Sequence, residues 1–383
     1  MKLIKSIFQI FKREIRLIRS DKDIIIILLL SPLFYALFYS SVYLNKDKTD
    51  IPLTIVNMDN SSASRLYTKN LDAHRFIEVK EVIGNFEKAK ESVMNLESFG
   101  VLYIPADFET ELKKSKGADI KVFLNNSRFL LSNNLNRGIQ EVTAGLNYGV
   151  RYKYFRSLGY SDQQAKKWIE PIRAEVNYIP NTANNYGGYI IPSVLILVLM
   201  MTLAIGFAMS IAKEREENSF ETLMKSGIST VFFGKSLFYI ILYLAYSLVF
   251  YSVIFSEFQL RFGGSFILVL LVTALFFAAV SSFTYFAATF FNRKIFALQF
   301  LALSSYPIFF LSGYSFPLES MPVFIKNLAL LNPLTPYIDS FVRLGLMDAD
   351  FRFLFPQIIH LILLAIAGFT LAYIRIKFFI KKN

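Results

Sequence analysis

A short charged stretch decides the fold of this chain: Lys213-Glu214-Arg215-Glu216-Glu217-Asn218-Ser219-Phe220-Glu221-Thr222-Leu223-Met224-Lys225-Ser226-Gly227. The runs before it (187–212) and after it (237–256) contain no charged side chain. Each run is long enough to cross a bilayer core of about 30 Å, which takes about 20 apolar residues in a helix. The charged stretch is therefore predicted to be a short loop at the membrane surface, between two spans.

A short helix is predicted within this stretch. Phe220, Leu223 and Met224 have the i, i+3, i+4 spacing of one apolar stripe, and Asn218 or Ser219 can cap its start. So short a helix is not stable alone, which favours docking into the groove of a partner. A solvated loop with incidental charge is the alternative, and the spacing by itself leaves both open.

Composition places the chain among integral membrane proteins. Of its 383 residues 54% are hydrophobic, including 40 Phe and 21 Tyr, and the mean hydropathy is +0.43. The net charge of +12 is explained by Lys and Arg flanking membrane spans on the cytoplasmic side, so no nucleic-acid partner is inferred. The absence of Cys excludes disulfides and thiolate sites, and two His residues make a histidine metal cluster improbable.

The N-terminal residues 1–23 are predicted to form a basic amphipathic helix in the cytoplasmic headgroup region. Its apolar stripe consists of Ile4, Ile7, Phe8, Phe11, Ile15 and Ile18. The following run, 24–44, is predicted to be a retained first span, kinked or opened near Pro32. A signal peptide is the alternative, but the run is too long for a signal core and lacks a small-residue cleavage site.

Residues 45–185 are predicted to form an extracytoplasmic α/β domain, because strand and helix patterns alternate there. The expected strands are Ile51–Asn57, Phe76–Val82, Gly100–Ile104 and Ile120–Asn125, with helices at Phe86–Leu96, Ala106–Lys114 and through most of 129–168. Ser161 is expected to cap the last helix.

Five further spans are expected in residues 186–383, at Tyr189–Ala212, Ser236–Ser256, Ser265–Phe291, Ile295–Gly313 and Gln357–Ile376. The short segments that carry most of the Lys and Arg are assigned to the cytoplasm, which places both termini there. The predicted fold class is an α-helical integral membrane protein with six transmembrane helices and the inserted domain. A cytoplasmic loop at 213–230 and an outer loop at 314–354 complete it. The outer loop is apolar and broken by prolines, so it is expected to dip into the outer leaflet.

Several kinds of chemistry are missing from the sequence. Gly234-Lys235-Ser236 resembles the end of a P-loop, but Ser229 stands where the first glycine is required and the segment enters a span. No nucleotide site is therefore expected in this chain. The predicted spans have no central Asp, Glu, Lys or Arg, which argues against proton- or ion-coupled transport. Gln299 and His360 are candidate path-lining residues, with a helix–helix hydrogen bond as the alternative.

Two motifs resemble those of ABC-2 type exporter permeases. Glu214-Arg215-Glu216, followed by Glu221 and Leu223, is similar to the coupling-loop pattern E-R-E-x-G-T-x-E-x-L, with Asn218-Ser219 in place of Gly-Thr. The stretch Ser312–Pro322 fills the outer-loop pattern S-G-x-x-F-P-x-x-x-M-P, and N-P-x-T follows at Asn332–Thr335. The order of elements also fits that family, so the resemblance covers essentially the whole chain.

The resemblance implies the permease subunit of an ABC exporter, which is not itself an enzyme. It implies a separate ABC ATPase subunit that holds ATP and magnesium, and a second permease, identical or paralogous. Relatives with an outer domain often work with a periplasmic membrane-fusion adaptor, and a bacterial inner membrane is the implied location, with lipid around the spans. Relatives export drugs, lipids, polysaccharides and ions, and nothing in the spans selects among these.

The resemblance also assigns residues to roles. ATPase coupling is expected at Glu214, Arg215, Glu216, Phe220, Glu221 and Leu223. An outer gate is expected to be shaped by Gly313, Pro317, Glu319, Pro322, Asn332, Pro333 and Arg343. Two other classes stay open: a non-transporting receptor or scaffold whose outer domain binds a ligand, and a polymer- or lipid-processing membrane enzyme with outer catalytic acids.

Overall fold

The computed structural model describes residues 2–43, 48–114, 117–171, 186–260 and 262–382. The chain divides into two compact units: Met1–Lys46 with Asn177–Asn383, and Asp47–Val176. The predicted domain borders at 44–45 and 185–186 adjoin residues 44–47 and 172–185, which lie outside the described residues.

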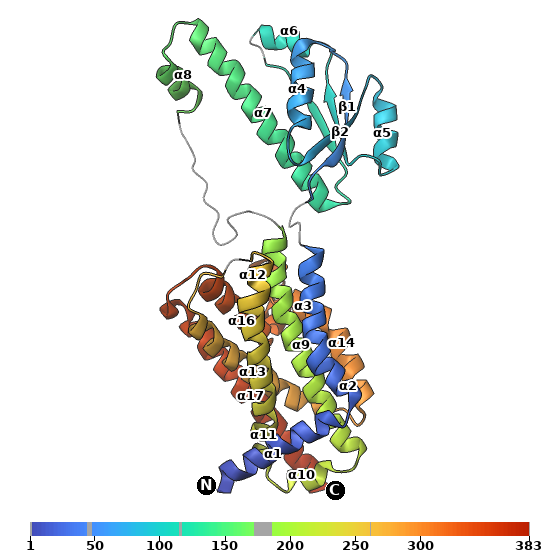
Figure 1. Cartoon of the computed structure of the whole chain (residues 1–383), viewed down its shortest axis with the longest axis vertical. Coiled ribbons are helices and arrows are strands. Elements are labelled where there is room, and N and C mark those ends of the chain that lie inside the picture. Colours follow the sequence, from blue (N-terminus) through green and yellow to red (C-terminus); the bar gives the residue numbers. More distant parts are fainter. Residues whose placement is uncertain (1, 44–47, 115–116, 172–185, 261, 383) are drawn as a thin grey trace. The chain divides into compact units, whose positions relative to one another are not determined.

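The unit Asp47–Val176 contains a four-stranded sheet in the order β2-β1-β3-β4. β1 pairs in parallel with β2 and β3, and β4 runs antiparallel to β3. The elements, shown in Figure 1, are β1 (Ile51–Asn57), α4 (Ser62–Asp72), β2 (Ile77–Ile83), α5 (Phe86–Met94), β3 (Gly100–Ile104), α6 (Phe108–Lys113), β4 (Lys121–Leu124), α7 (Phe129–Ser157) and α8 (Asp162–Ile169).

Helices cover both faces of this sheet. On one face Tyr67 of α4 and Leu135 of α7 join the core, and on the other Ala89 of α5 packs with Val56 and Val101. The central strands are therefore buried on both faces, as continuous apolar runs in parallel sheets usually are. The strands predicted at β1 and β3 are confirmed with the same bounds, and Ser161 caps α8 in a capping box. Helix α4, which Ser61 caps directly after β1, was not predicted.

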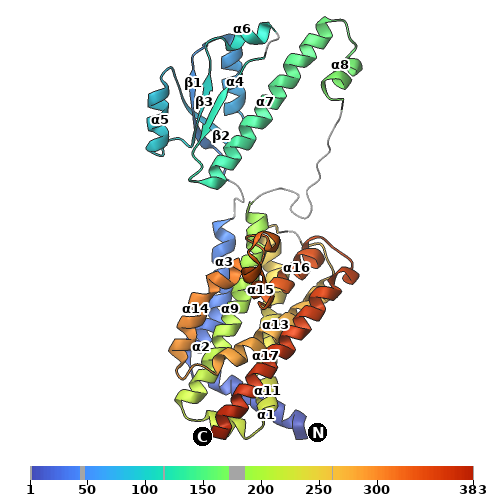
Figure 2. The same cartoon turned by 180° about the vertical axis from the view of Figure 1, so that it is seen from behind.

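The other unit is helical, and within its described residues five helices are long and apolar enough to cross a membrane. Its elements are α1 (Lys2–Arg19), α2 (Lys22–Ile25), a π-helical turn (Ile26–Leu30), α3 (Ser31–Val42), α9 (Tyr186–Glu216), α10 (Phe220–Met224), α11 (Ile228–Val249), a π-helical turn (Phe250–Ile254), α12 (Phe255–Glu257), α13 (Phe266–Ala288), α14 (Lys294–Phe310), α15 (Val323–Leu330), α16 (Leu334–Phe341), a π-helical turn (Val342–Leu346) and α17 (Phe355–Lys382). Figure 2 shows α1 and the C-terminal end of α17 together at one end of this unit, which is the end where Figure 1 labels α10.

The central helix of this unit is α9, and most of its apolar length is buried against α3, α13 and α14. A helix that is apolar all round is expected in such a buried position. Gly206 of α9 allows close packing, because a Cβ there would lie 2.2 Å from Leu28. Leu28 belongs to the π-helical turn that precedes Pro32, so the predicted opening of the first span near this proline is confirmed.

Three of the differences between predicted and observed helices bear on the functional site and on the number of spans. Helix α9 continues to Glu216, so the charged stretch begins inside a helix rather than in a loop. Helix α11 begins at Ile228, eight residues before the predicted span, which places Lys235 within it. Helix α14, at the position of the fifth predicted span, has 17 residues and is about 25 Å long. It is shorter than the five candidate spans, so six spans are not confirmed.

We expect Gly234→Ala to loosen α1 from α11. A Cβ at Gly234 would lie 2.6 Å from Cβ of Ile10 and 2.8 Å from the carbonyl oxygen of Ile7, so the two helices must separate. Overpacking of this kind costs about 1–3 kcal/mol. Trypsin cleavage within α1, followed by mass spectrometry, should therefore accelerate about fivefold or more.

The matched control for this change is Gly149→Ala in α7, where a Cβ would meet nothing within 4 Å. It should leave cleavage within α1 at the wild-type rate. Equal cleavage rates in the Gly234→Ala variant and the wild type would contradict the close crossing of α1 and α11.

Candidate functional site

Two oppositely charged side chains are buried together where α1 packs on α11. Glu14 of α1 and Lys235 of α11 are each only 1% exposed. The Lys235 ammonium donates to one carboxylate oxygen of Glu14 and, at 2.8 Å, to the hydroxyl of Ser210 in α9. The hydroxyl of Tyr239 donates to the other Glu14 oxygen at 2.8 Å. The carboxylate of Glu14 therefore joins α1, α9 and α11.

A second buried carboxylate, Glu214 at the end of α9, lies beside this pair and is also 1% exposed. Arg13 donates to its Oε2 at 2.6 Å, and the hydroxyl of Ser219 donates to the same oxygen. Its Oε1 lies 3.7 Å from Nζ of Lys235. That distance is too long for a hydrogen bond, so the contact is electrostatic only, and Oε1 has no hydrogen-bond partner among the described residues.

Arg13, Glu14, Glu214 and Lys235 together form what we call the buried ion network. Its two positive and two negative groups balance. Moving each charge out of water is costly, and mutual attraction offsets that cost only when partners and hydrogen bonds are all in place. The network therefore favours the docked position of α1 over any position that leaves Glu14, Glu214 or Lys235 buried alone, whereas Arg13 is 38% exposed and reaches water.

Arg215 holds the end of α9 to two other helices. Its guanidinium donates to the carbonyl oxygen of Thr289, just after α13, at 2.7 Å. It also lies over the rings of Phe220 in α10, at 5.2 Å, and Phe379 in α17, at 4.5 Å. Cation–π contacts of this length are favourable, so Arg215 fixes α10 against the last helix.

The apolar stripe of α10 faces this chain and not a partner. Phe220 and Leu223 are buried in the core of the helical unit, which corrects the expectation that the stripe fills a partner's groove. Ser219 does not cap α10 with its side chain, because its hydroxyl is bonded to Glu214. Glu216 and Glu221 are exposed, so the accessible face of this region is acidic.

Asp21, between α1 and α2, forms a second ionic junction. It lies 3.1 Å from the ammonium of Lys213 in α9 and 2.8 Å from that of Lys294 in α14. Burial raises the pKa of this carboxyl, but the hydrogen bonds from Lys294 and Lys213 outweigh it and hold the pKa below its ordinary value. The ionised Asp21 therefore connects the start of the first span to α9 and α14.

The predicted outer-gate residues surround the turns between α14 and α17. Gly313 has a φ of +85°, which favours glycine, and a Cβ there would lie 2.6 Å from Leu318. Pro322 and Pro333 immediately precede α15 and α16. The side chain of Asn332 donates to the carbonyl oxygen of Ile308 at 2.9 Å and ties this region to α14.

A cavity of about 470 Å³ lies at this end, and Gly313, Glu319, Arg343 and His360 all line it. Arg343 donates to Asp339 at 2.9 Å. Three of the predicted gate residues and one candidate path residue are thus brought together. Pro317, Pro322, Asn332 and Pro333 are not among the lining residues, and they act on the shape of the turns.

The two candidate path residues differ in their surroundings. Nε2 of His360 lies 2.8 Å from the carbonyl oxygen of Leu330, which can only accept, so Nε2 carries the proton. Gln299 is exposed on α14 and lines neither this cavity nor a second one, formed by the ends of α9, α13 and α17. A path-lining role for either residue stays a prediction.

Sequence reasoning missed the two central members of the network, Glu14 and Lys235. Glu14 was assigned to the polar face of an amphipathic helix, but it lies at i+4 from Ile10 and i−4 from Ile18, and all three are buried. That spacing was the available signal. Lys235 lies one residue before the predicted span Ser236–Ser256, because the residues that begin α11 are less apolar than those that follow.

We expect Lys235→Met to destabilise the helical unit strongly. The change leaves the carboxylate of Glu14 buried without a cation. Removing one partner of a buried ion pair costs about 3–5 kcal/mol of folding stability. Thermal unfolding of the detergent-solubilised protein should shift down by several degrees. The double change Glu14→Gln with Lys235→Met should recover much of the loss, because no unpaired charge then stays buried.

Lys225→Met is the matched control, since Lys225 is an exposed lysine of the same region. It should leave the unfolding temperature near that of the wild type. Losses that simply add in the double variant would show that Glu14 and Lys235 do not interact.

Comparison with known proteins places the chain in a sequence context. Residues 22–374 match the sequence model of a family described as ABC-2 family transporter protein. The chain is 22% identical to the Escherichia coli K12 "Inner membrane transport permease YhhJ" over 98% of both chains. It is also 22% identical to the E. coli K12 "Probable multidrug ABC transporter permease YbhR" over 70% of both chains.

Proposed function

This chain belongs to the ABC-2 family of transporter proteins and is a multi-pass membrane protein, and from that premise we propose that it couples a separate ATPase subunit to export of a substrate. In this proposal ATP and magnesium are bound by the ATPase, and this chain performs no chemistry of its own. Two copies, or this chain and a paralogous permease, form the path. The names of the relatives support an inner-membrane location and a multidrug substrate range.

The observation that carries the proposal is the buried ion network. It connects α1, which lies at one end of the helical unit, to two long apolar helices, α9 and α11. Because Glu14, Glu214 and Lys235 are buried and cannot be left unpaired at low cost, a displacement of α1 is transmitted to α9 and α11. A force applied at this end by a nucleotide-dependent partner would therefore move helices that cross the membrane.

The face available to such a partner is acidic. Glu216 and Glu221 are exposed, while Phe220 and Leu223 hold the same segment to the core from the other side. Helix α10 is thus packed against the core on its inner side, so a force applied to its exposed face does not detach it. Charge complementarity with a basic groove on the ATPase would give the contact its specificity.

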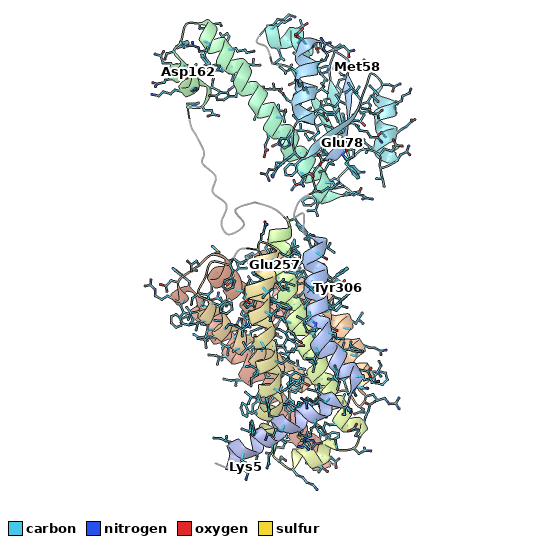
Figure 3. The ribbon with its side chains drawn as sticks, in the orientation of Figure 1. Lys5, Met58, Glu78, Asp162, Glu257 and Tyr306 are labelled. Atoms are coloured by element: carbon cyan, nitrogen blue, oxygen red, sulfur yellow. The ribbon has the colours of Figure 1, made fainter. Side chains whose placement is uncertain are left out.

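The opposite end of the unit suits an exit gate. Figure 3 labels Lys5 and Glu257 at the two ends of the helical unit, and the cavity beside Arg343 lies among the turns between α14 and α17. Glycine and proline set the backbone of these turns. In the proposal the α/β unit receives substrate beyond this gate or binds a periplasmic adaptor.

The first test is purification of the complex from the native membrane in mild detergent, with the ATPase activity of the preparation as readout. The double change Glu216→Arg with Glu221→Arg should reduce the co-purifying ATPase activity about tenfold or more, because it reverses two exposed charges at the proposed contact. The matched control is Glu257→Arg, an exposed glutamate at the other end of the unit, which should retain the ATPase.

Two outcomes would oppose the proposal. Wild-type protein that is intact but always free of an ATPase would favour the receptor or scaffold class. Equal ATPase retention by all three proteins would place the contact away from the acidic face of α10.

A further inference from the structure

A second cavity, of about 620 Å³, lies where the ends of α9, α13 and α17 meet. Its lining includes Arg215, Phe220, Thr289, Phe290, Arg375 and Phe379. This is the end of the unit that also carries α1 and α10 (Figure 1).

Two guanidinium groups converge in this cavity on the same residue. Arg215 donates to the carbonyl oxygen of Thr289 at 2.7 Å, and Arg375 donates to the hydroxyl of Thr289 at 2.8 Å. The guanidinium of Arg375 also lies 3.7 Å from the ring centre of Phe290. Within the described part of the chain, no Asp or Glu lies within ion-pair distance of either arginine. The cavity therefore holds two positive charges that its own walls do not neutralise.

One wall of the cavity is apolar and exposed. Leu371 and Ile374 line it from α17, and Leu371 lies one turn before Arg375 on the same face of that helix. Leu371 and Ile374 are 45% and 47% exposed, and Phe290 and Phe378 are more than half exposed. Because α17 is a candidate membrane span, this wall continues onto the surface that hydrocarbon covers. The positively charged cavity and the apolar side chains of Leu371 and Ile374 therefore lie next to each other.

We propose that this cavity binds the phosphate of an anionic phospholipid headgroup, with the acyl chains along Leu371 and Ile374. Guanidinium groups bind phosphate oxygens through paired N–H donors, and basic pockets between transmembrane helices suit such headgroups. An acidic segment of a protein partner would also meet the two charges. The exposed apolar wall favours the lipid, because a soluble segment would leave that wall uncovered. This inference rests on family membership and not on the proposed coupling.

The test measures binding of dioctanoyl phosphatidylglycerol to the purified full-length protein in detergent by native mass spectrometry. Parallel titrations use dioctanoyl phosphatidylcholine and inorganic phosphate. Wild-type protein should prefer phosphatidylglycerol over phosphatidylcholine by about tenfold, and Arg375→Gln should weaken phosphatidylglycerol binding by about five- to tenfold. Arg293→Gln is the matched control: it removes an exposed arginine near the same end that does not line the cavity. It should bind as the wild type does.

Each other outcome overturns the proposal. Equal losses of phosphatidylglycerol binding in the Arg375→Gln and Arg293→Gln variants would mean that diffuse surface charge, and not this cavity, attracts the lipid. Inorganic phosphate that binds with the same dependence on Arg375 while the lipid does not would assign the site to a free anion. Loss of ATPase co-purification with unchanged lipid binding would assign it to a protein partner. If the Arg375→Gln variant fails to fold, a wild-type protein that binds both lipids alike still decides against the site.

Discussion

The ion pair between Glu14 and Lys235 is the constraint on which the arrangement of the helical unit depends. Two groups that are each 1% exposed cannot separate without leaving a charge in a medium of low polarity. Hydrophobicity alone would not fix α1 in this way, because Ile4 and Phe8 of its apolar stripe stay exposed. The docking of α1 therefore depends on this charge pair together with the burial of Ile10 and Ile18, and the exposed apolar side chains are free to lie against lipid headgroups.

The ionic contacts form a continuous connection across one end of the unit. The buried ion network joins α1 to α9 and α11, and Asp21 joins the next helix to α9 and α14. Arg215 then connects the end of α9 to α10 and α17. Every long helix at this end is thereby linked through polar contacts, while the middle of the unit is packed by apolar side chains. Polar connections between the helices at one end of the unit, with apolar packing in its middle, suit a subunit that transmits motion from that end.

The sequence predicted the kinds of element well and their ends poorly. Uncharged runs longer than 18 residues locate helices such as α9 and α13, because hydropathy measures the burial of whole segments. The end of α9 was misplaced since Lys213 and Arg215 are charged, although helical hydrogen bonding continues through them to Glu216. The prolines of the outer loop interrupt it as expected, and Pro322 and Pro333 stand directly before α15 and α16, because the missing N–H of proline acts locally.

The functional residues fall into two groups: those within one sequence motif, and those that only the packing of helices brings together. A motif in one segment, such as Glu214 to Leu223, can be read directly from the sequence. Glu14 and Lys235 are 221 residues apart, and their meeting depends on how α1 packs, which no local pattern records. The sequence also did not predict which face of α10 is exposed, because Phe220 could pack equally well against a partner or against the core of its own chain.

The π-helical turn at Ile26–Leu30 has a geometric consequence for the first span. Such a turn holds one residue more than an α-helical turn, and each residue of an α-helix advances its side chain by about 100°. Residues four apart in an α-helix are turned by about 40° relative to each other, so a buried face with that spacing drifts around the helix. The extra residue of the π turn takes up much of this drift. Leu28 in the turn and Ala36 and Ser40 after it are all buried, while Phe34 and Phe38 stack on the exposed side. One extra residue thus keeps the same face of a long span directed at its own subunit.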